Sequence, residues 1–152
     1  MVGLTGSAEA VIDATADAVF ALLTTPSRLP AWNATMVGIE EDPGVVSVGS
    51  EWVVNFQVAG AMRWRSRSRC EELNAVLRTF EHRSATDDGN SSFSLWRWTV
   101  TPETGGARVR VGWDLHPATF WRRSLLGPMR NRMLRREVPA SLAALAAVAS
   151  RG

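Results

Sequence analysis

The sequence predicts one α+β domain over residues 1–152, in which a seven-stranded antiparallel sheet wraps around a long C-terminal helix, with two short helices between the first two strands. Three observations predict this fold. The length of 152 residues fits a single hydrophobic core. The middle of the chain alternates with the period of two that is typical of strands. The last part repeats apolar residues at helical spacing.

The first strand is expected at residues 8–13, followed by the two short helices. Thr15 is a suitable N-cap, with Asp17 in the first turn, where its charge favours the helix dipole. Four apolar residues then share one helical face: Ala16, Val19, Phe20 and Leu23. Pro26 ends this helix because proline lacks an N–H and restricts the residue before it. Residues 27–32 are expected to form the second helical turn.

Six further strands are expected where the period changes to two. They are residues 36–41, 51–59, 62–72, 76–85, 92–101 and 107–115. The breaks between them carry turn residues: Pro43-Gly44, Gly60, Asp88-Gly89-Asn90 and Gly105-Gly106. Short connections require antiparallel neighbours, because a parallel pair needs a long crossover. The result is a meander whose edge is completed by the first strand.

The strand at residues 62–72 alternates most clearly. One face carries Arg63, Arg65, Arg67 and Arg69, and the other carries Met62, Trp64, Ser66, Ser68 and Cys70. Four guanidinium groups without partners cannot face an apolar core, so the arginine face is expected to be solvent-exposed, paired with Glu51 or Glu81. The inward face is small and polar in its middle, which leaves room for a ligand beneath a helix.

The last helix is expected at residues 119–150. Its apolar positions recur at helical spacing: Leu134, Val138, Leu142, Leu145 and Ala149. Gly127-Pro128 and Pro139 are expected to bend or interrupt it. The apolar stretch at residues 142–149 is far shorter than the ~20 residues that a membrane span requires, so no such span is expected.

With this order of elements, several segments resemble the START-like (SRPBCC) superfamily of the polyketide cyclase/dehydrase type. Residues 14–32 resemble its opening, a "VF–LL" helix followed by an "LP–W" segment. Residues 48–52 resemble its "GVGS–W" entry into a strand, and residues 105–109 resemble its "GGTRV" hairpin, with Ala107 in place of threonine. Residues 72–74, 126–129 and 142–145 match later pieces. The resemblance implies a helix-grip fold with a deep cavity. The family contains lipid and hormone binders, polyketide cyclases and metal-dependent hydroxylase components.

Composition and motifs exclude several classes of function. The two histidines, His82 and His116, lie on different expected strands without metal-ligand spacing, so no metal is expected. No phosphate-binding loop is present, and no cofactor is expected. The net charge of +2 is too small to indicate nucleic acid. Cys70 is the single cysteine, and together with the expected absence of a signal peptide it predicts a cytoplasmic protein, of the bacterial type.

The resemblance implies that Trp64, Trp98 and Phe120 lie at the family's cavity or its entrance, and Ser66 and Ser68 are expected on the inward face of the same strand as Trp64. These five are the expected ligand-binding residues, because indole rings with a few hydroxyls suit a flat, mostly apolar ligand. His82 is the candidate catalytic residue. A turn near Asn74 would place it opposite Ser66 or Ser68, although an ordinary cross-strand hydrogen bond explains the same position.

Three functions follow from these residues. The first is binding of a small hydrophobic ligand, polyketide-, sterol- or lipid-like, by a monomer or homodimer. The second is a metal-free cyclase or dehydratase acting on a β-keto chain, in which the serines or His82 move protons. The third is a protein-interaction module that uses the arginine face. The sequence does not decide whether a reaction is catalysed.

Overall fold

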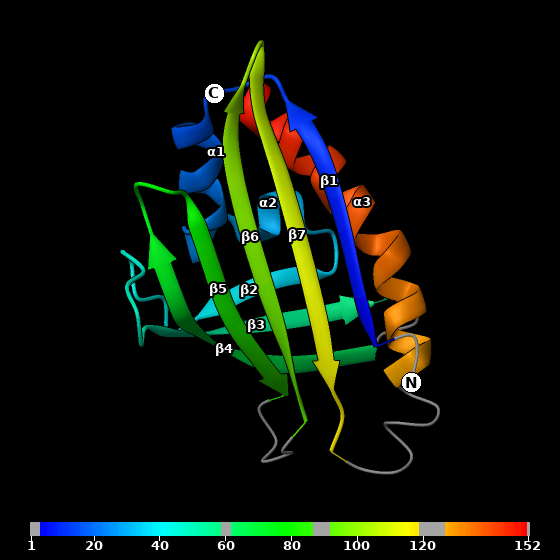
Figure 1. Ribbon diagram of the computed structural model, residues 1–152. Helices are drawn as coiled ribbons and strands as arrows, with labels where there is room; N and C mark the ends of the chain where they lie inside the picture. The colour runs from blue at the N-terminus through cyan, green and yellow to red at the C-terminus, as the bar shows by residue number, and fades with distance from the viewer. Residues whose placement is uncertain (1–3, 59–61, 87–91, 119–126, 152) are drawn as a thin grey trace.

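A computed structural model describes residues 4–58, 62–86, 92–118 and 127–151, and in these ranges seven strands form one sheet that faces a long helix (Figure 1). The elements in chain order are β1 (Thr5–Ile12), α1 (Ala16–Leu23), the 3-10 turn η1 (Pro26–Arg28), α2 (Leu29–Trp32), β2 (Met36–Glu40), β3 (Glu51–Val58), β4 (Met62–Asn74), β5 (Thr79–Thr86), β6 (Phe93–Glu103), β7 (Gly106–His116) and α3 (Gly127–Arg151).

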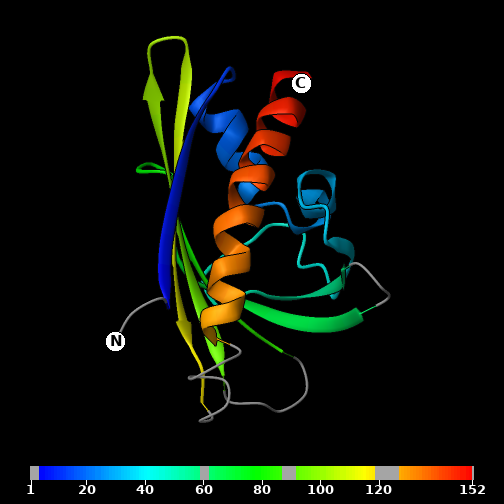
Figure 2. The ribbon, with the colours of Figure 1, turned by 90° about the vertical axis from the view of Figure 1, so that its right-hand side faces the viewer.

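All neighbouring strands are antiparallel, in the order β1-β7-β6-β5-β4-β3-β2. The predicted meander, with the first strand completing one edge, is therefore confirmed. Figure 2 shows the sheet curving, so that β2, β3 and β4 turn away from the plane of β1 and β7 and pass beside the N-terminal half of α3. The sheet thus wraps around the helix, and the predicted fold class is confirmed.

The start of α1 follows from its capping residue. The Thr15 hydroxyl accepts a hydrogen bond from the Ala18 backbone N–H at 3.1 Å, which satisfies a donor that the first helical turn leaves free. The buried residues of α1 are the four predicted from the helical spacing: Ala16, Val19, Phe20 and Leu23. After Thr24, Pro26 begins η1, which leads directly into α2. The two predicted short helices are confirmed.

The β4–β5 hairpin differs from the prediction in its turn. Residues 75–78 form a turn instead of the first part of a strand. The Asn74 side-chain oxygen accepts hydrogen bonds from the N–H groups of Val76 and Leu77, at 3.0 and 2.9 Å. Arg78 has a positive φ of 54°. An Asn that bonds forward in this way closes a turn, and β5 consequently begins at Thr79.

This turn moves His82 along the sheet. His82 pairs with Cys70, whereas Ser68 pairs with Ser84 and Ser66 with Thr86. The prediction that His82 lies opposite Ser66 or Ser68 is therefore wrong by at least two residues. Two local features cause the difference: the turn at 75–78 lies further along the chain than assumed, and the ladder has a bulge between Cys70 and Glu72.

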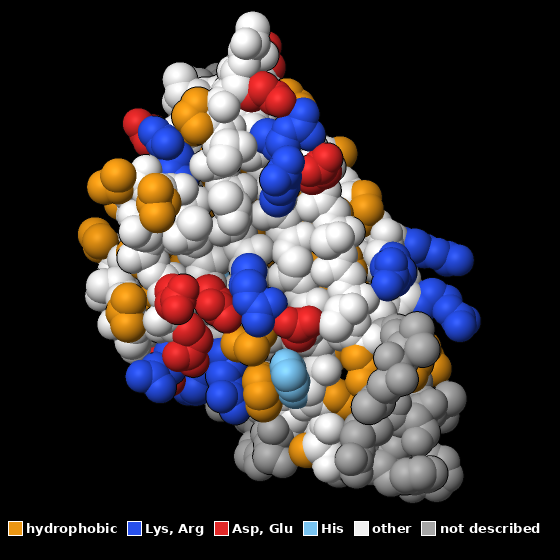
Figure 3. Space-filling view, in the orientation of Figure 1, with side chains coloured by type: hydrophobic (Ala, Val, Ile, Leu, Met, Phe, Trp, Pro, Cys, Tyr) orange, Lys and Arg blue, Asp and Glu red, His pale blue; other side chains and the backbone are white. Residues whose placement is uncertain are grey.

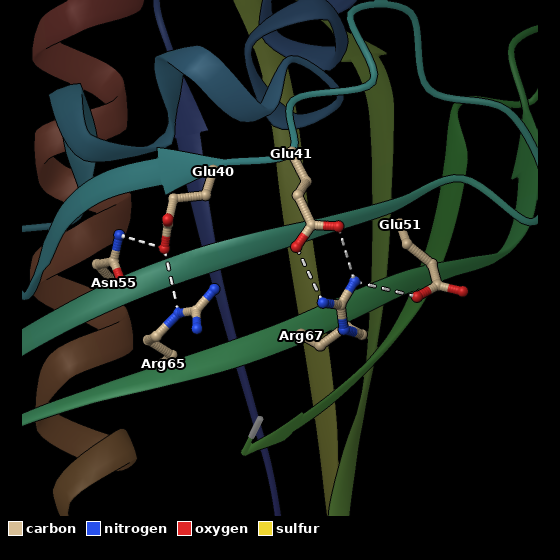
Figure 4. Close-up of polar contacts among 6 residues, drawn as sticks. All are labelled: Glu40, Glu41, Glu51, Asn55, Arg65 and Arg67. Atoms are coloured by element: carbon tan, nitrogen blue, oxygen red, sulfur yellow. Dashed lines mark hydrogen bonds and ion pairs between the residues drawn. The ribbon is translucent and has the colours of Figure 1, made fainter. Parts of the chain in front are cut away.

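The two faces of β4 agree with the prediction from Trp64 onward, whereas Met62, predicted to face inward, is exposed at the start of the strand. Ser66, Ser68 and Cys70 are buried, and the alternating arginines point outward. Arg65 forms an ion pair with Glu40 at 3.1 Å (Figure 4). Arg67 contacts Glu41 at 2.9 Å and the predicted partner Glu51 at 3.4 Å. The other predicted partner was wrong, because Glu81 pairs with Arg97 of β6, at 3.4 Å. Figure 3 shows basic and acidic side chains beside one another on this outer face.

The described part of the C-terminal helix starts at Gly127, and the predicted residues 119–126, with Phe120 among them, lie outside the described ranges. α3 continues through Pro139 to Arg151, so the proline does not interrupt it. Among the described residues, no helix combines the length and apolar character that crossing a bilayer requires.

A buried amide fixes α3 to one edge of the sheet. The Trp113 indole N–H donates to Asn131 Oδ1 at 2.7 Å, and Asn131 Nδ2 donates to the Thr5 carbonyl at 3.1 Å. Asn131 is only 2% exposed. Gly6 lies against this bridge, where any larger side chain would overlap the Trp113 indole. One side chain of α3 therefore joins β1 and β7, the two strands at this edge.

Replacing Asn131 with leucine should lower the free energy of unfolding by about 2 kcal/mol, because the buried indole N–H of Trp113 loses its acceptor and the Thr5 carbonyl loses one of its two donors. Urea unfolding followed by circular dichroism measures this change. The control is Arg132→Leu on the neighbouring exposed position, which should change stability by about 0.5 kcal/mol or less. Equal effects of the two substitutions would mean that the bridge does not hold the helix.

Candidate ligand cavity

A cavity of about 310 Å³ lies between the sheet and α3. α3 packs chiefly against β1 at one sheet edge, and α2 packs against its other side. The helix therefore spans the curved sheet without filling the space above the central strands. A pocket between a sheet and a helix, with mostly apolar walls and a few polar groups, is the usual form of a small-molecule site.

Small hydroxyl side chains lie on the sheet side of the cavity, among larger side chains. They include Ser66 and Ser68 of β4, Ser84 of β5 and Ser94 of β6. Ser66 and Ser68 are only 7% and 3% exposed, so they face the interior as their parity on β4 predicts. Because a serine side chain is short, the side chains at these positions do not extend as far as α3. The small residues in the middle of β4 are thus one physical cause of the empty space.

Apolar side chains make up most of the remaining wall. They include Leu23, Leu29, Trp32, Trp52, Val54, Phe56, Trp64, Phe80, Trp96, Trp98, Leu134 and Val138. Trp64 stacks on Phe56 with ring centroids 4.9 Å apart, and Trp32 meets Trp98 edge to face at 5.7 Å. These contacts hold the rings in fixed orientations and leave broad apolar surfaces toward the cavity.

His82 is the titratable group at the centre of the sheet side. Its ring is stacked with Trp96 at 6.3 Å and lies 5.0 Å from the ring of Phe80. Burial lowers the pKa of His82 to about 3, because these surroundings disfavour a charged imidazole. The ring is partly accessible from the cavity, which it lines. At neutral pH the imidazole is therefore uncharged.

The hydrogen bonds of His82 connect it to the hydroxyl groups. The Trp98 indole N–H donates to His82 Nε2 at 3.1 Å. The other ring nitrogen, Nδ1, lies 3.5 Å from Ser84 Oγ, at the long limit of a hydrogen bond. Ser84 Oγ in turn lies 2.8 Å from Ser68 Oγ. The result is a row of polar groups, Trp98–His82–Ser84–Ser68, along the sheet side of the cavity.

A charged pair faces the cavity from α3. Arg130 donates to Glu137 at 2.8 Å, and both side chains are about one-third exposed. The guanidinium of Arg130 also lies over the Trp64 ring, 6.0 Å from its centroid, which is at the outer limit of a cation–π contact. The two charges compensate each other, so this wall contributes no net charge to the cavity.

The structure brings five of the six predicted site residues to one cavity: Trp64, Ser66, Ser68, His82 and Trp98. The sixth, Phe120, lies outside the described residues. The sequence interpretation missed Ser84, Arg130 and Glu137. Ser84 shares the face of His82 two residues along β5, and Arg130 and Glu137 lie seven positions apart on one helical face, so parity and helical spacing could have indicated all three.

Comparison with known proteins gives a consistent result. The family described as "Polyketide cyclase / dehydrase and lipid transport" matches residues 4–150. No curated protein matches the chain significantly.

Among solved structures, protein CV1439 from Chromobacterium violaceum has a TM-score of 0.75 at 19% identity, covering 97% of this chain and 98% of that one. A START superfamily protein from Mycobacterium smegmatis has a TM-score of 0.74 at 13% identity, covering 97% of each chain. The di-domain ARO/CYC protein BexL, from the BE-7585A biosynthetic pathway, has a TM-score of 0.68 at 19% identity, covering 93% of this chain and 44% of that one. At these identities the likeness concerns the fold.

The depressed pKa of His82 predicts a pH dependence of stability. Between about pH 3 and pH 6.5 the unfolded chain binds a proton at His82 that the folded chain does not bind, so stability falls as the pH falls through this range. We expect this residue to account for a loss of about 2 kcal/mol between pH 7 and pH 5. Urea unfolding of the wild type and of His82→Gln at pH 7 and pH 5 measures this loss of unfolding free energy. The same pH dependence in both proteins would contradict a neutral, buried His82.

Proposed function

The chain belongs to the polyketide cyclase / dehydrase and lipid transport family, and from this premise we propose that it binds a small, flat, mostly apolar ligand between the sheet and α3. One observation carries the proposal: a cavity with aromatic and aliphatic walls contains a short row of uncharged polar groups. Burial of apolar ligand surface supplies the affinity, and a few polar groups supply the orientation.

The size of the cavity favours a compact ligand. Its volume of about 310 Å³ is at the low end of small-molecule pockets, which run from about 300 to 1,000 Å³. A compact fused-ring polyketide fits a cavity of this volume better than a large sterol or a long acyl chain does. The proposed contact residues are Trp64 and Trp98 for the flat faces of such a ligand, with Ser66 and Ser68 below it.

A second candidate function is a metal-free cyclase or dehydratase acting on a β-keto chain. The row His82–Ser84–Ser68 on the cavity wall favours it, because such groups can hold or move protons at a bound substrate. A pKa of about 3 makes His82 a weak general base near neutral pH, which is a reason to rank this function second. Catalysis would then depend mainly on the orientation of a reactive substrate by the cavity.

Filling part of the cavity should weaken ligand binding. Ser66→Leu places a branched apolar side chain among the lining residues and should weaken binding of 1-aminoanthracene, a flat fluorescent probe, by at least about tenfold, which corresponds to about 1.4 kcal/mol. Arg69→Leu, on the opposite face of the same strand, is the control and should leave the affinity unchanged. Titration of probe fluorescence measures both. Absence of saturable binding by the wild type would overturn the proposed function.

His82→Gln distinguishes the two functions. For an enzyme that uses His82, the substitution should lower the rate of β-keto thioester cyclisation by about 100-fold or more and leave 1-aminoanthracene affinity within a few-fold. For a binding protein, the wild type shows no turnover above the uncatalysed rate. Product formation followed by liquid chromatography measures this rate. Wild-type turnover that survives the substitution at full rate would remove His82 from the reaction.

A further inference from the structure

The contact between Trp98 and His82 assigns the proton on the imidazole. An indole N–H is a donor and never an acceptor. Because it points at His82 Nε2 from 3.1 Å, this nitrogen must accept and therefore carries no hydrogen. Burial keeps the pKa of His82 at about 3, so the ring is neutral and its single N–H is on Nδ1. Trp98 thus selects one of the two neutral tautomers.

The tautomer determines the role of the nearest hydroxyl. With its hydrogen on Nδ1, His82 donates toward Ser84 Oγ, 3.5 Å away, so Ser84 accepts on this side. Ser84 and Ser68 have two hydroxyl hydrogens between them, and their mutual hydrogen bond of 2.8 Å uses one. Within the described ranges, no other acceptor takes the second. Whichever of the two serines donates to the other, the remaining serine therefore keeps a free O–H donor beside the cavity.

Three other hydroxyls on the cavity wall use their hydrogens internally. Ser66 donates to the Ala85 carbonyl at 3.1 Å, Ser94 to the Ser84 carbonyl at 3.4 Å, and Thr24 to the Phe20 carbonyl at 2.9 Å. These three hydroxyls have no hydrogen to offer a ligand. The Ser68–Ser84 pair differs from them because each of its oxygens faces the other rather than a backbone carbonyl.

We propose that the Ser68–Ser84 pair is a binding site for an uncharged acceptor oxygen of the ligand, such as a ring ketone, and that Trp98 is the positioning residue that keeps His82 from competing for this donor. The assignment rests on the proposed ligand-binding function. A ketone fits better than a carboxylate because no group in the row Trp98–His82–Ser84–Ser68 carries a positive charge. The guanidinium of Arg130, on the α3 wall, already pairs with Glu137. The ligand is thus a flat apolar molecule with its carbonyl toward β4 and β5.

The tautomer is tested without any ligand. In a long-range ¹H–¹⁵N spectrum of the ¹⁵N-labelled protein at pH 7, His82 should show a protonated Nδ1 and an unprotonated Nε2, and the comparison with His82→Gln assigns its signals. Trp98→Phe removes the indole donor, so the ring should populate both tautomers and the two nitrogen shifts should move toward each other. A protonated Nε2 in the wild type, or no change in Trp98→Phe, would overturn the role of Trp98.

The donor is tested with two probes that differ by one carbonyl, fluorenone and fluorene. The wild type should bind fluorenone about five- to tenfold more tightly, as expected for one hydrogen bond. Ser68→Ala/Ser84→Ala should lose this preference and still bind fluorene. Thr24→Val is the control, because the Thr24 hydroxyl already donates to the Phe20 backbone carbonyl, and this variant should keep the preference. Calorimetric titration measures all affinities, and circular dichroism confirms that each variant is folded.

The outcomes separate this inference from the proposed function. Equal affinity of the wild type for the two probes, or a preference that survives in the double variant, overturns the donor site and leaves ligand binding in place. Failure of both probes to bind the wild type overturns the proposed function and the donor site with it, while the nitrogen spectrum still decides the role of Trp98 on its own.

Discussion

The cavity depends on how α3 is held. Asn131 joins the helix to the Trp113 indole and the Thr5 carbonyl, at the edge formed by β7 and β1. Arg135 adds a second hydrogen bond to the same carbonyl at 2.9 Å. With one side fixed at this edge and the other against α2, the helix spans the curved sheet instead of lying on its central strands (Figure 2). The short serines of β4 then leave an unfilled volume under a helix that is already fixed in position.

The same strand creates two surfaces of opposite chemistry. On the outer face of β4, guanidinium groups pair with carboxylates in water, where each pair contributes little stability. On the inner face, the serine hydroxyls of β4 hydrogen-bond to neutral groups of the neighbouring β5, Ser84 and the His82 imidazole beyond it, in a region that disfavours charge. In the proposed function, these uncharged polar groups orient the ligand without the large cost of burying an unpaired ion.

Much of the fold could be predicted because it depends on periodicity. The change from a period of 3.6 to a period of two marks α1 and the meander, and parity alone separates Arg67 from Ser66 and Ser68. Cross-strand neighbours were harder to predict, because the Asn74 turn and the bulge after Cys70 are local backbone features that shift the pairing of His82. Arg130 and Glu137 share the helical face of Leu134 and Val138, but they were missed because charged side chains on a helix usually face solvent.

The most direct test of this account is where a ligand lies when it binds. Isotope-filtered NOE spectra of the ¹³C-labelled protein with unlabelled fluorene should show contacts to the methyl groups of Val54 on the sheet and of Leu134 and Val138 on α3, because these side chains line the same cavity. Contacts from one ligand to both walls would place it between the sheet and the helix. Contacts confined to exposed methyl groups, such as those of Val76 and Leu77 at the end of the β4–β5 hairpin, would contradict the account.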